Sequence, residues 1–511
     1  MKLLLSLTSF ILSILLNAQN KIVLDISKAK DTINKNIYGH FSEDLGRCIY
    51  DGFYVGDNKN IPNKNGVRSD IIEALKKLKI SVLRWPGGCF ADNYHWKDAI
   101  GPKDKRKPIE NVSWGNVRED NSFGTNEFLD MCEMLDAEPY LAVNVGSGTV
   151  QDAQDWVKYV NHKNGTSSFT DMRQSSGRAQ PWNVKYWGIG NESWDCGGHM
   201  TPEYYAGLYS QYATFMTSYN NTEKLFRIAV GPGSEDYHWT EVIMRDVPRK
   251  LLEGISVHHY SVVNWSKKGS ATNFTKDEYF RTMEEASKME QFISKNSEVM
   301  DKYDPQKKVA LVVDEWGGWY DAEPGTNRDF LYQQSTMRDA MIAGLTLNIF
   351  NNHCDRVKMA NLAQCVNVLQ AVILTNKEKM ILTPTYHVME MYNVHQDALM
   401  IPISLSSNDY VQGDKKLKAV SVSASKDKTG VVHISLVNID ANSEQTVNID
   451  LGNISARSVA GRMLRSDKLQ DHNTFEDPNK IKPQTFSNAK LNGSNLELKM
   501  PPFSVIVLEL K

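Results

Sequence analysis

The sequence predicts an α/β protein in which a (β/α)8 TIM barrel is followed by a C-terminal β-sandwich with jelly-roll-like strands. Three observations support this fold. Strand-like apolar runs alternate with amphipathic helical stretches from about residue 37 to about residue 383. Beyond residue 400, short strand-like runs follow one another between Gly, Asn, Asp and Pro turns. A chain of 511 residues exceeds one ordinary core, so two domains are expected.

The predicted barrel strands are β-branched and aromatic runs, with apolar residues at helical spacing between them. These strands are residues 37–43, 82–88, 139–146, 185–192, 226–231, 255–260, 309–316 and 345–353. The clearest helices are residues 68–78, 126–135, 202–219, 282–294 and 330–343. A doubly wound open sheet is the alternative, but it usually carries a glycine-rich phosphate loop after its first strand. Residues 37–43 form no such loop.

The predicted sandwich consists of short strands at residues 417–424, 429–437, 445–451, 458–464, 496–500 and 504–510. Residues 21–26 also read as a strand and precede the barrel, so we expect them to pair into the same sandwich. The resulting division is residues 1–18, a signal peptide; 19–36, a strand segment that joins the sandwich; 37–385, the barrel; and 386–511, the sandwich.

The start of the chain predicts export. Met1-Lys2 is followed by an almost wholly apolar stretch at residues 3–16 and then by a plausible cleavage point after Ala18. This stretch is short for a membrane span, although an uncleaved N-terminal anchor is the alternative. No later window is apolar enough to cross a bilayer. We therefore expect a soluble mature protein that is periplasmic or secreted.

The net charge of the chain indicates which kinds of molecule it binds. With 58 Lys and Arg against 61 Asp and Glu, the net charge of −3 gives no electrostatic reason to expect nucleic acid or an anionic membrane. A neutral polymer such as a polysaccharide fits better.

The six cysteines permit several disulfide connectivities, contain no Cys-x-x-Cys pair and support no particular bridge. His258, His259 and His353 lack zinc-site spacing, so neither a metal nor a cofactor is expected.

Two predicted strands end in a carboxylate. Glu192 follows residues 185–191, and Glu315 follows residues 309–314. Active sites of such barrels lie at the C-terminal ends of the strands, and strands 4 and 7 lie on opposite sides of a narrow barrel. Cleavage of a glycosidic bond needs one carboxyl group to protonate the leaving oxygen and another to attack or stabilise the anomeric carbon. A lone Glu at such a place would more simply be a helix cap or an ion-pair partner, but the facing pair favours a glycosidase.

Other polar residues share these strand ends. Glu43 ends strand 1, and Arg84 lies in strand 2, where it is either a structural cation or a group that keeps a nearby carboxylate ionised. His258 and Tyr260 end strand 6, and His258 is either a core histidine or a donor to the nucleophile.

Three tryptophans, Trp194, Trp316 and Trp319, lie next to the two carboxylates, where each either stacks on a sugar or packs in the core.

Together these residues resemble glycoside hydrolase family 51, the α-L-arabinofuranosidases. The motifs that carry the resemblance occur in order over essentially the whole mature chain. They are Tyr38-Gly-His-Phe-Ser-Glu43-Asp-Leu-Gly46, Leu83-Arg84-Trp-Pro-Gly-Gly88, Trp187-Gly-Ile-Gly-Asn191-Glu192, His258-His-Tyr260, Asp314-Glu315-Trp316 and Asn361-Leu-Ala-Gln364.

The resemblance implies a role for each matching residue. Glu192 matches the general acid/base, Glu315 the nucleophile and Asn191 the residue that binds the sugar 2-hydroxyl. Glu43 and Gln364 match residues that hold the remaining hydroxyls of the terminal furanose.

Further positions match residues at the edge of the site. Tyr260 matches a residue that bonds the nucleophile, and Trp319 and Trp114 match aromatics around the subsites. Cys89 departs from a common version of the pattern, which has Asn after Pro-Gly-Gly. Since a thiol donates only weakly, Cys89 either makes a weak contact with the sugar or merely packs beneath the ring.

The resemblance implies a retaining, exo-acting α-L-arabinofuranosidase that acts on arabinan, arabinoxylan or arabino-oligosaccharides, assembled as a trimer or hexamer. An endo-β-glucanase or β-xylosidase on the same barrel is the alternative. A non-catalytic polysaccharide-binding protein is a third possibility, disfavoured because both carboxylates are present. The sandwich is expected to brace the barrel, with carbohydrate binding as the alternative.

Overall fold

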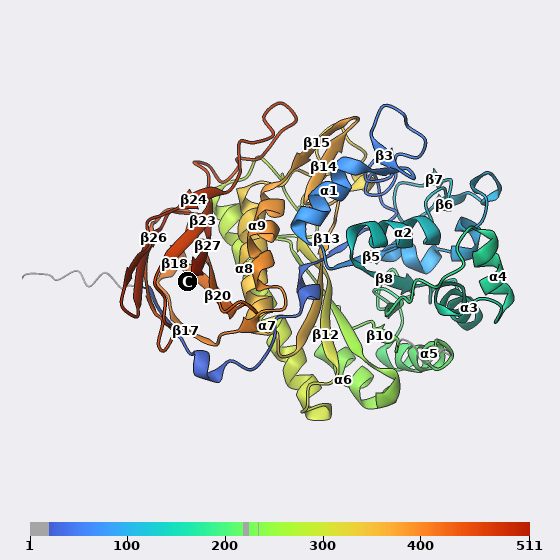
Figure 1. Ribbon diagram of the computed structural model, residues 1–511, viewed down its shortest axis with the longest axis horizontal. Helices are drawn as coiled ribbons and strands as arrows, with labels where there is room; N and C mark the ends of the chain where they lie inside the picture. Colours follow the sequence, from blue (N-terminus) through green and yellow to red (C-terminus); the bar gives the residue numbers. More distant parts are fainter. Residues whose placement is uncertain (1–19, 218–223, 234) are drawn as a thin grey trace, which may run out of the picture.

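The computed structural model describes residues 20–217, 224–233 and 235–511 (Figure 1). Within this part of the chain, eight parallel strands close into a barrel in the order β10-β11-β12-β13-β2-β5-β8-β9. The strands are β2 (Gly39–Phe41), β5 (Val82–Trp85), β8 (Glu138–Val143), β9 (Tyr186–Ile189), β10 (Phe226–Ala229), β11 (Gly254–Ser261), β12 (Ala310–Gly318) and β13 (Val357–Ala363). The predicted TIM barrel is therefore confirmed.

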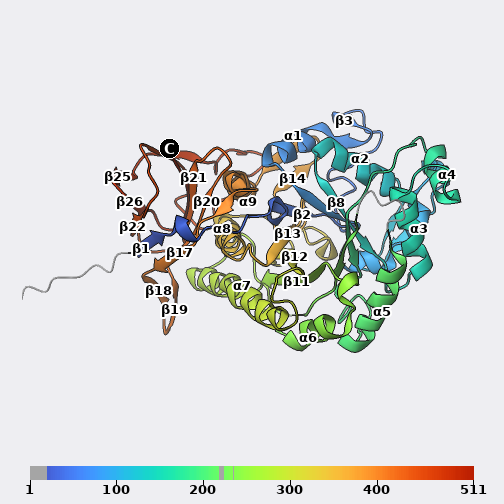
Figure 2. The same cartoon turned by 60° about the horizontal axis from the view of Figure 1, so that its bottom comes forward.

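Helices surround the barrel, as Figure 2 shows. They are α1 (Ser69–Leu78), α2 (Thr125–Leu135), α3 (Val150–Asn161), α4 (Ser168–Ser175), α5 (Pro202–Phe215), α6 (Tyr237–Asp246), α7 (Lys276–Tyr303), α8 (Met337–Asn352) and α9 (Pro384–Tyr392). Most of these helices begin after a residue whose side chain accepts a hydrogen bond from a backbone N–H group of the first turn. Thr275, for example, accepts from the N–H of Glu278 at the start of α7, where Glu278 bonds back to complete a capping box.

Short elements lie in the connecting loops. The 3-10 turns are η1 (Ile26–Lys28), η2 (Lys35–Tyr38), η3 (Cys89–Asn93), η4 (Trp96–Ala99), η5 (Lys103–Lys105), η6 (Arg249–Leu251), η7 (Arg328–Phe330) and η8 (Asn393–His395). The two-stranded hairpins are β3 (Asn63–Lys64) with β4 (Val67–Arg68), β6 (Ile109–Asn111) with β7 (Val117–Glu119), β14 (Ile373–Asn376) with β15 (Lys379–Leu382), and β18 (Asp409–Gln412) with β19 (Lys415–Lys418).

The prediction for the eighth strand is wrong. Residues 345–352 belong to α8, His353 follows the end of this helix, and the eighth strand is β13, a few residues further on. Every residue of α8 from Met337 to Asn351 is buried. A helix that is covered all round lacks a polar face, so its sequence has no helical periodicity and reads as a continuous apolar run.

The C-terminal domain is a sandwich of two sheets with a separate apolar core. One sheet has the order β17-β1-β22-β26-β25 and the other the order β16-β20-β21-β27-β23-β24. The strands are β1 (Asn20–Leu24), β16 (Leu399–Met400), β17 (Ile403–Ser406), β20 (Val420–Lys426), β21 (Val432–Asn438), β22 (Gln445–Asp450), β23 (Val459–Leu464), β24 (Gln484–Phe486), β25 (Lys490–Asn492), β26 (Asn495–Met500) and β27 (Ser504–Leu510). Strand β1 pairs with β17 and β22, so the start of the described chain lies in the sandwich. The domain boundaries given above stay predictions.

Helix α8 joins the two domains, lying between the barrel strands and the sandwich (Figure 1). Asn348 donates to the Oγ of Ser421 at 3.1 Å, and Ser423 donates to Asn348 at 2.8 Å. A Cβ atom on Gly344 would come within 2.8 Å of Val437 in β21, so the helix approaches the sheet closely because this residue is glycine. The sandwich thus covers the outer side of a barrel helix.

None of the helices in the described residues has the length and apolarity needed to cross a membrane. The predicted signal peptide, residues 1–18, lies outside the described residues.

Candidate active site

A cavity of about 390 Å³ opens at the C-terminal ends of the barrel strands. Most of the sequence-predicted site residues line it. The lining residues are Glu43, Leu45, Gly88, Cys89, Trp114, Asn191, Glu192, Trp194, Asp195, Tyr260, Trp265, Glu315, Trp319, Leu331, Gln364 and Leu369. Arg84 and His258 are not among them, and both bond to the carboxylates of this wall.

Glu315 is buried and bonded through both carboxylate oxygens. Arg84 donates to Oε1 at 2.8 Å, and the Tyr260 hydroxyl donates to Oε2 at 2.8 Å. A second nitrogen of Arg84 donates to Oδ1 of Asn191 at 2.7 Å. Arg84 therefore orients the carboxylate on strand β12 and the amide after strand β9 at the same time.

His258 lies between three carboxylates, not beside the nucleophile alone as expected. Its Nδ1 is 2.8 Å from Oε1 of Glu192 and its Nε2 is 3.1 Å from Asp314, whereas Glu315 is 3.5 Å away. Burial opposes a charged ring, but Glu315 and Asp314 outweigh it and raise the pKa of His258 to about 10. The ring is therefore an imidazolium that donates to Glu192 and forms an ion pair with Asp314.

Glu192 follows β9 with a left-handed backbone, at φ 38°. Burial and the charge of Glu315 raise the pKa of Glu192 above its ordinary value, against the lowering effect of the His258 hydrogen bond. Because His258 donates to Oε1, a proton on this carboxyl group belongs on Oε2. These are the properties of a carboxylic acid that gives up a proton in a reaction.

Glu43 and Gln364 form the floor of the cavity. Oε1 of Glu43 accepts from the N–H groups of Gly88 and Phe90 and from Trp114, and Oε2 accepts from Gln364 at 3.1 Å. Burial, followed by the charge of Glu315, raises the pKa of Glu43 to about 7. Oε1 of Gln364 is buried without a partner in the structure, so it is available to a ligand hydroxyl.

Gly88 allows the β5 loop to pass close to the carboxylates. A Cβ atom here would lie 2.8 Å from Oε1 of Glu315 and 3.4 Å from the Asn191 amide. The Pro-Gly-Gly motif is therefore a steric requirement of the site.

Two buried aspartates support the site, although the sequence predicts a role for neither. Asp314 accepts a hydrogen bond from the Tyr140 hydroxyl at 2.8 Å and contacts His258. Burial would raise the pKa of Asp314, but the positive charges of Arg84 and His258 hold this pKa below its ordinary value. Asp92 accepts from the backbone N–H of Asn191 at 3.2 Å. Both stand within a few residues of a predicted strand end, but the sequence does not show which way they point.

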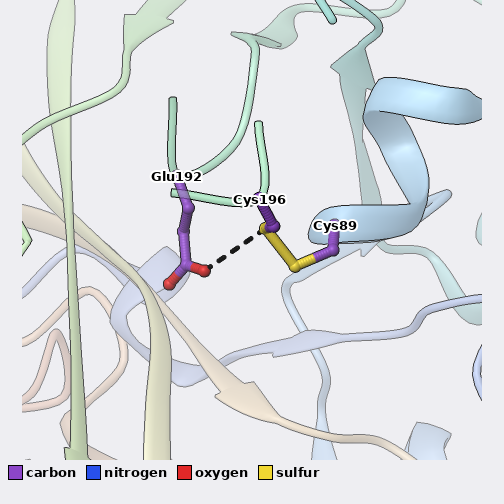
Figure 3. Close-up of side chains that lie close together, drawn as sticks. All are labelled: Cys89, Glu192 and Cys196. Atoms are coloured by element: carbon purple, nitrogen blue, oxygen red, sulfur yellow. Dashed lines mark hydrogen bonds between the residues drawn. A yellow bond between two sulfur atoms is a disulfide. The ribbon is translucent and has the colours of Figure 1, made fainter. Parts of the chain in front are cut away.

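A disulfide joins Cys89, in η3 after β5, to Cys196, in the loop after β9. Figure 3 shows this bridge beside Glu192. The Sγ atom of Cys196 lies 3.6 Å from Oε2 of the carboxyl group. The expectation of a free Cys89 thiol is therefore wrong. The two cysteines are 107 residues apart, so only the meeting of two loops at the barrel rim brings their Cα atoms to 5.6 Å.

Aromatic side chains surround the cavity mouth. Trp319 packs edge-to-face on Tyr260, at 5.1 Å between ring centres, and on Trp265 at 5.5 Å. Trp265, for which the sequence predicts no role, is 59% exposed. Trp316, in contrast, is buried against Phe350. Of the tryptophans beside the two carboxylates, Trp316 therefore packs in the core, and Trp194 and Trp319 face the cavity.

Glu192, His258 and Glu315 present ligand atoms within 4.8 Å of one another. This group is a poor metal site, because His258 with its raised pKa carries a proton on both nitrogens and a metal needs a neutral ring. One oxygen of Glu192 and one of Glu315 therefore lie within 4.8 Å of each other, which is compatible with the roughly 5 Å between the carboxyl groups of retaining glycosidases. The arrangement therefore suits cleavage of an acetal through a covalent intermediate.

Comparison with known proteins agrees with this chemistry. The intracellular exo-α-L-arabinofuranosidase of Bacteroides ovatus is 49% identical over 514 residues, which cover 100% of this chain and 99% of that protein. The crystal structure of the GH51 arabinofuranosidase from Xanthomonas axonopodis pv. citri matches with a TM-score of 0.94 and 42% identity, over 96% of this chain and 100% of that chain. The arabinose complex of the Thermotoga maritima α-L-arabinofuranosidase matches with a TM-score of 0.85 and 30% identity, over 96% and 99%.

The same comparison contradicts the predicted location. The Bacteroides ovatus relative, similar over the whole of this chain, is named an intracellular enzyme. An apolar run at the start of a chain is a pattern of composition, shared by leaders and by other apolar segments, and does not alone determine a compartment. The prediction of a periplasmic or secreted protein is wrong, and the predicted signal peptide loses its support.

Two family models match separate parts of the chain. The α-L-arabinofuranosidase 1 domain matches residues 74–281, and the α-L-arabinofuranosidase C-terminal domain matches residues 314–504. These matches, with the full-length relatives, decide against the endo-β-glucanase and β-xylosidase alternative. The chain belongs to glycoside hydrolase family 51 and is an exo-acting α-L-arabinofuranosidase.

Proposed function

We propose that Glu192 is the general acid/base and Glu315 the nucleophile of a retaining reaction that releases terminal α-L-arabinofuranosyl residues. The observation that carries this proposal is the pair of facing carboxyl groups with oxygen atoms within 4.8 Å. Inverting enzymes separate their carboxyl groups by about 6.5–9.5 Å to leave room for a water molecule. The shorter separation favours direct attack by a carboxylate.

In the first step, Oε2 of Glu192 gives its proton to the departing oxygen while Glu315 attacks the anomeric carbon. Arg84 and Tyr260 hold the attacking carboxylate in place. In the second step, Glu192 takes a proton from water, the water attacks the arabinosyl ester, and Glu315 leaves. Two inversions at one carbon keep the configuration.

The remaining site residues bind the terminal furanose. Arg84 occupies Oδ1 of Asn191, and Nδ2 of Asn191 lies 3.8 Å from Sγ of Cys196, so the amide can give its other N–H to the 2-hydroxyl of the sugar. Glu43 and Gln364 bind the other hydroxyls at the closed floor of the cavity. A pocket with a floor of this kind accepts a chain end, which fits exo action.

Aromatic residues at the mouth of the cavity contact the rest of the substrate. Trp319 and Trp114 provide flat surfaces for the sugar beyond the scissile bond. The disulfide sulfur of Cys89 packs against the furanose ring. Arabinan, arabinoxylan and arabino-oligosaccharides all present terminal arabinofuranosyl groups to such a site.

We also propose a homotrimer or homohexamer, to be measured as a molar mass by light scattering.

The direct test is hydrolysis of 4-nitrophenyl α-L-arabinofuranoside by the purified protein, with proton NMR identifying the anomer first released. We expect retention of configuration, and loss of turnover in Glu315→Ala. First release of the inverted anomer would refute the assignment of Glu315 as nucleophile. Assays on a β-glucan and an aryl β-xyloside measure whether any second activity accompanies the first.

A further inference from the structure

The disulfide between Cys89 and Cys196 lies against the oxygen of Glu192 that faces away from His258. His258 bonds Oε1 of Glu192, while Sγ of Cys196 lies 3.6 Å from Oε2 (Figure 3). A sulfur atom in a disulfide carries no hydrogen, so this contact provides no donor to Oε2. The two sulfurs and one carboxylate oxygen of Glu192 all lie within 4.8 Å of one another.

We propose that this disulfide masks a binding site for Zn²⁺, or a similarly thiophilic divalent cation, that Cys89, Cys196 and Glu192 form when the bridge is reduced. Two thiolates and a carboxylate are a donor set that zinc prefers. Zinc bonds of about 2.3 Å to sulfur and about 2.0–2.2 Å to oxygen place tetrahedral S and O ligands about 3.5 Å apart. The sulfur of Cys196 and Oε2 of Glu192 already have this spacing.

Opening the site requires only a small dithiol. Cys196 is exposed at the surface, so a thiolate of the reductant can reach its sulfur. Attack gives a mixed disulfide, and the second thiol of the reductant then displaces the protein sulfur. The reductant leaves as a cyclic disulfide, and its two electrons and two protons end on Cys89 and Cys196. Zinc then displaces both thiol protons, binds both sulfurs and Oε2 of Glu192, and keeps water as its fourth ligand.

The other four cysteines provide an internal comparison. Cys48, Cys132, Cys354 and Cys365 are free and buried. In the described residues, none of them belongs to a group of three or more potential metal ligands, whereas Cys89 and Cys196 do. Buried thiols without such partners are expected to bind zinc weakly.

A metal ion at this position would also stop hydrolysis. It would occupy the lone pair of Oε2, on which the catalytic proton is carried in the proposed mechanism. The loss of activity rests on the proposed role of Glu192, but the binding of zinc does not. The proposed function and the proposed zinc site can therefore be tested separately. Inactivity of the oxidised, metal-free protein on arabinofuranosides would count against the proposed function but would not bear on zinc binding.

The test measures metal binding directly. The protein is reduced with dithiothreitol, desalted without oxygen and dialysed against ZnCl₂, and the bound zinc is counted by elemental analysis. Co²⁺ serves as a second probe, because thiolate ligation gives a charge-transfer absorption in the near ultraviolet. The matched control is the double variant Cys89→Ser, Cys196→Ser, which keeps the four buried thiols. Oxidised wild-type protein is the second control.

We expect one zinc per chain in the reduced protein that is absent from both controls. Glu192→Gln, which keeps both thiols, should weaken binding by at least about ten-fold through loss of the carboxylate ligand. Hydrolysis by the reduced wild type should fall on addition of zinc and recover with EDTA. Equal zinc content in the reduced wild type and in the double serine variant would overturn the proposal, as would a cobalt complex without thiolate absorption.

Discussion

At the scale of single residues, the site depends on how each carboxyl group is paired. Glu315 accepts from Arg84 and Tyr260, so both of its oxygens are bonded as acceptors. Glu192 accepts from His258 on one oxygen only. The two glutamates of one cavity therefore have different surroundings, which fits the proposed roles of Glu192 as the acid and Glu315 as the nucleophile.

The acid role of Glu192 predicts a dependence on the leaving group. In Glu192→Ala, we expect the first step to survive for aryl arabinofuranosides with acidic phenols, which need no protonation, and to fall by about 10²- to 10⁴-fold for alkyl arabinofuranosides. The check is a comparison of single-turnover rates over a series of leaving groups. An equal loss for all leaving groups would argue against the acid role.

The pairing of His258 with Glu192 predicts a shift in the pH profile. The positive ring lowers the pKa of Glu192, and His258→Asn removes that charge. Since Glu192 must be protonated for the first step, activity should persist to higher pH in the variant. The alkaline limb of kcat/KM against pH measures this. His259→Asn, on the same strand but bonded to a backbone carbonyl of α7, is the control and should leave the limb in place. A shift of the alkaline limb of kcat/KM to lower pH in His258→Asn would contradict the pairing of His258 with Glu192.

At the scale of elements, Asp92 joins the loops that follow three barrel strands. It lies in η3 after β5, and it accepts from Val145 and Gly146 after β8 and from Asn191 after β9. Burial raises the pKa of Asp92 to about 7, against the lowering effect of these three N–H groups. The position of the Asn191-Glu192 peptide therefore depends on a side chain from another loop.

Replacing Asp92 should impair turnover more than binding. In Asp92→Asn, one carboxylate oxygen becomes an NH₂ group that opposes a backbone N–H, so a loop must move. We expect kcat to fall about ten-fold or more while KM changes little, and stability to fall by about 1–3 kcal/mol. Steady-state kinetics and thermal unfolding measure the two effects. Asp98→Asn, which breaks a partly exposed ion pair with Lys107, is the control. Wild-type kcat in Asp92→Asn would contradict the positioning role.

At the scale of the whole molecule, α8 is the element on which both domains pack. Tyr38, near the bottom of the barrel, donates to Asn351 at 2.8 Å, and Asn351 donates to Ser423 of the sandwich at 3.1 Å. This chain of bonds crosses from one domain to the other inside the protein. It supports the expectation that the sandwich braces the barrel.

Asn351→Ala tests the bracing role. The variant leaves the buried Tyr38 hydroxyl without its acceptor and removes one of the two hydrogen bonds of Ser423, so we expect the free energy of unfolding to fall by about 1–3 kcal/mol. The rate on an aryl arabinofuranoside should not change, because Asn351 is not among the described residues that line the cavity. Asn352→Ala loses a single bond to the carbonyl of Val422 and should cost less. Equal unfolding midpoints for wild type and Asn351→Ala would contradict the coupling of the domains.

The sequence by itself determined the barrel, the sandwich and the two glutamates. Alternation of apolar runs with amphipathic helices is a local property, and the carboxyl ends of parallel strands meet at one rim whatever the details of packing. This is why Glu192 and Glu315 could be named as a facing pair. The motif resemblance added Glu43, Asn191 and Gln364, which line the same cavity.

Only the tertiary structure decided the features that depend on contacts between distant segments. Because α8 is buried on all sides, its sequence lacks an amphipathic pattern, and the apolar run at residues 345–353 predicts a strand instead. The Cys89–Cys196 bridge and the bonds of Asp92 form because the loops after β5, β8 and β9 converge at the rim. Residue spacing along the chain carries no information about which loops converge. Side-chain direction and contact between loops are products of the packed fold, so they appear only when the barrel has closed.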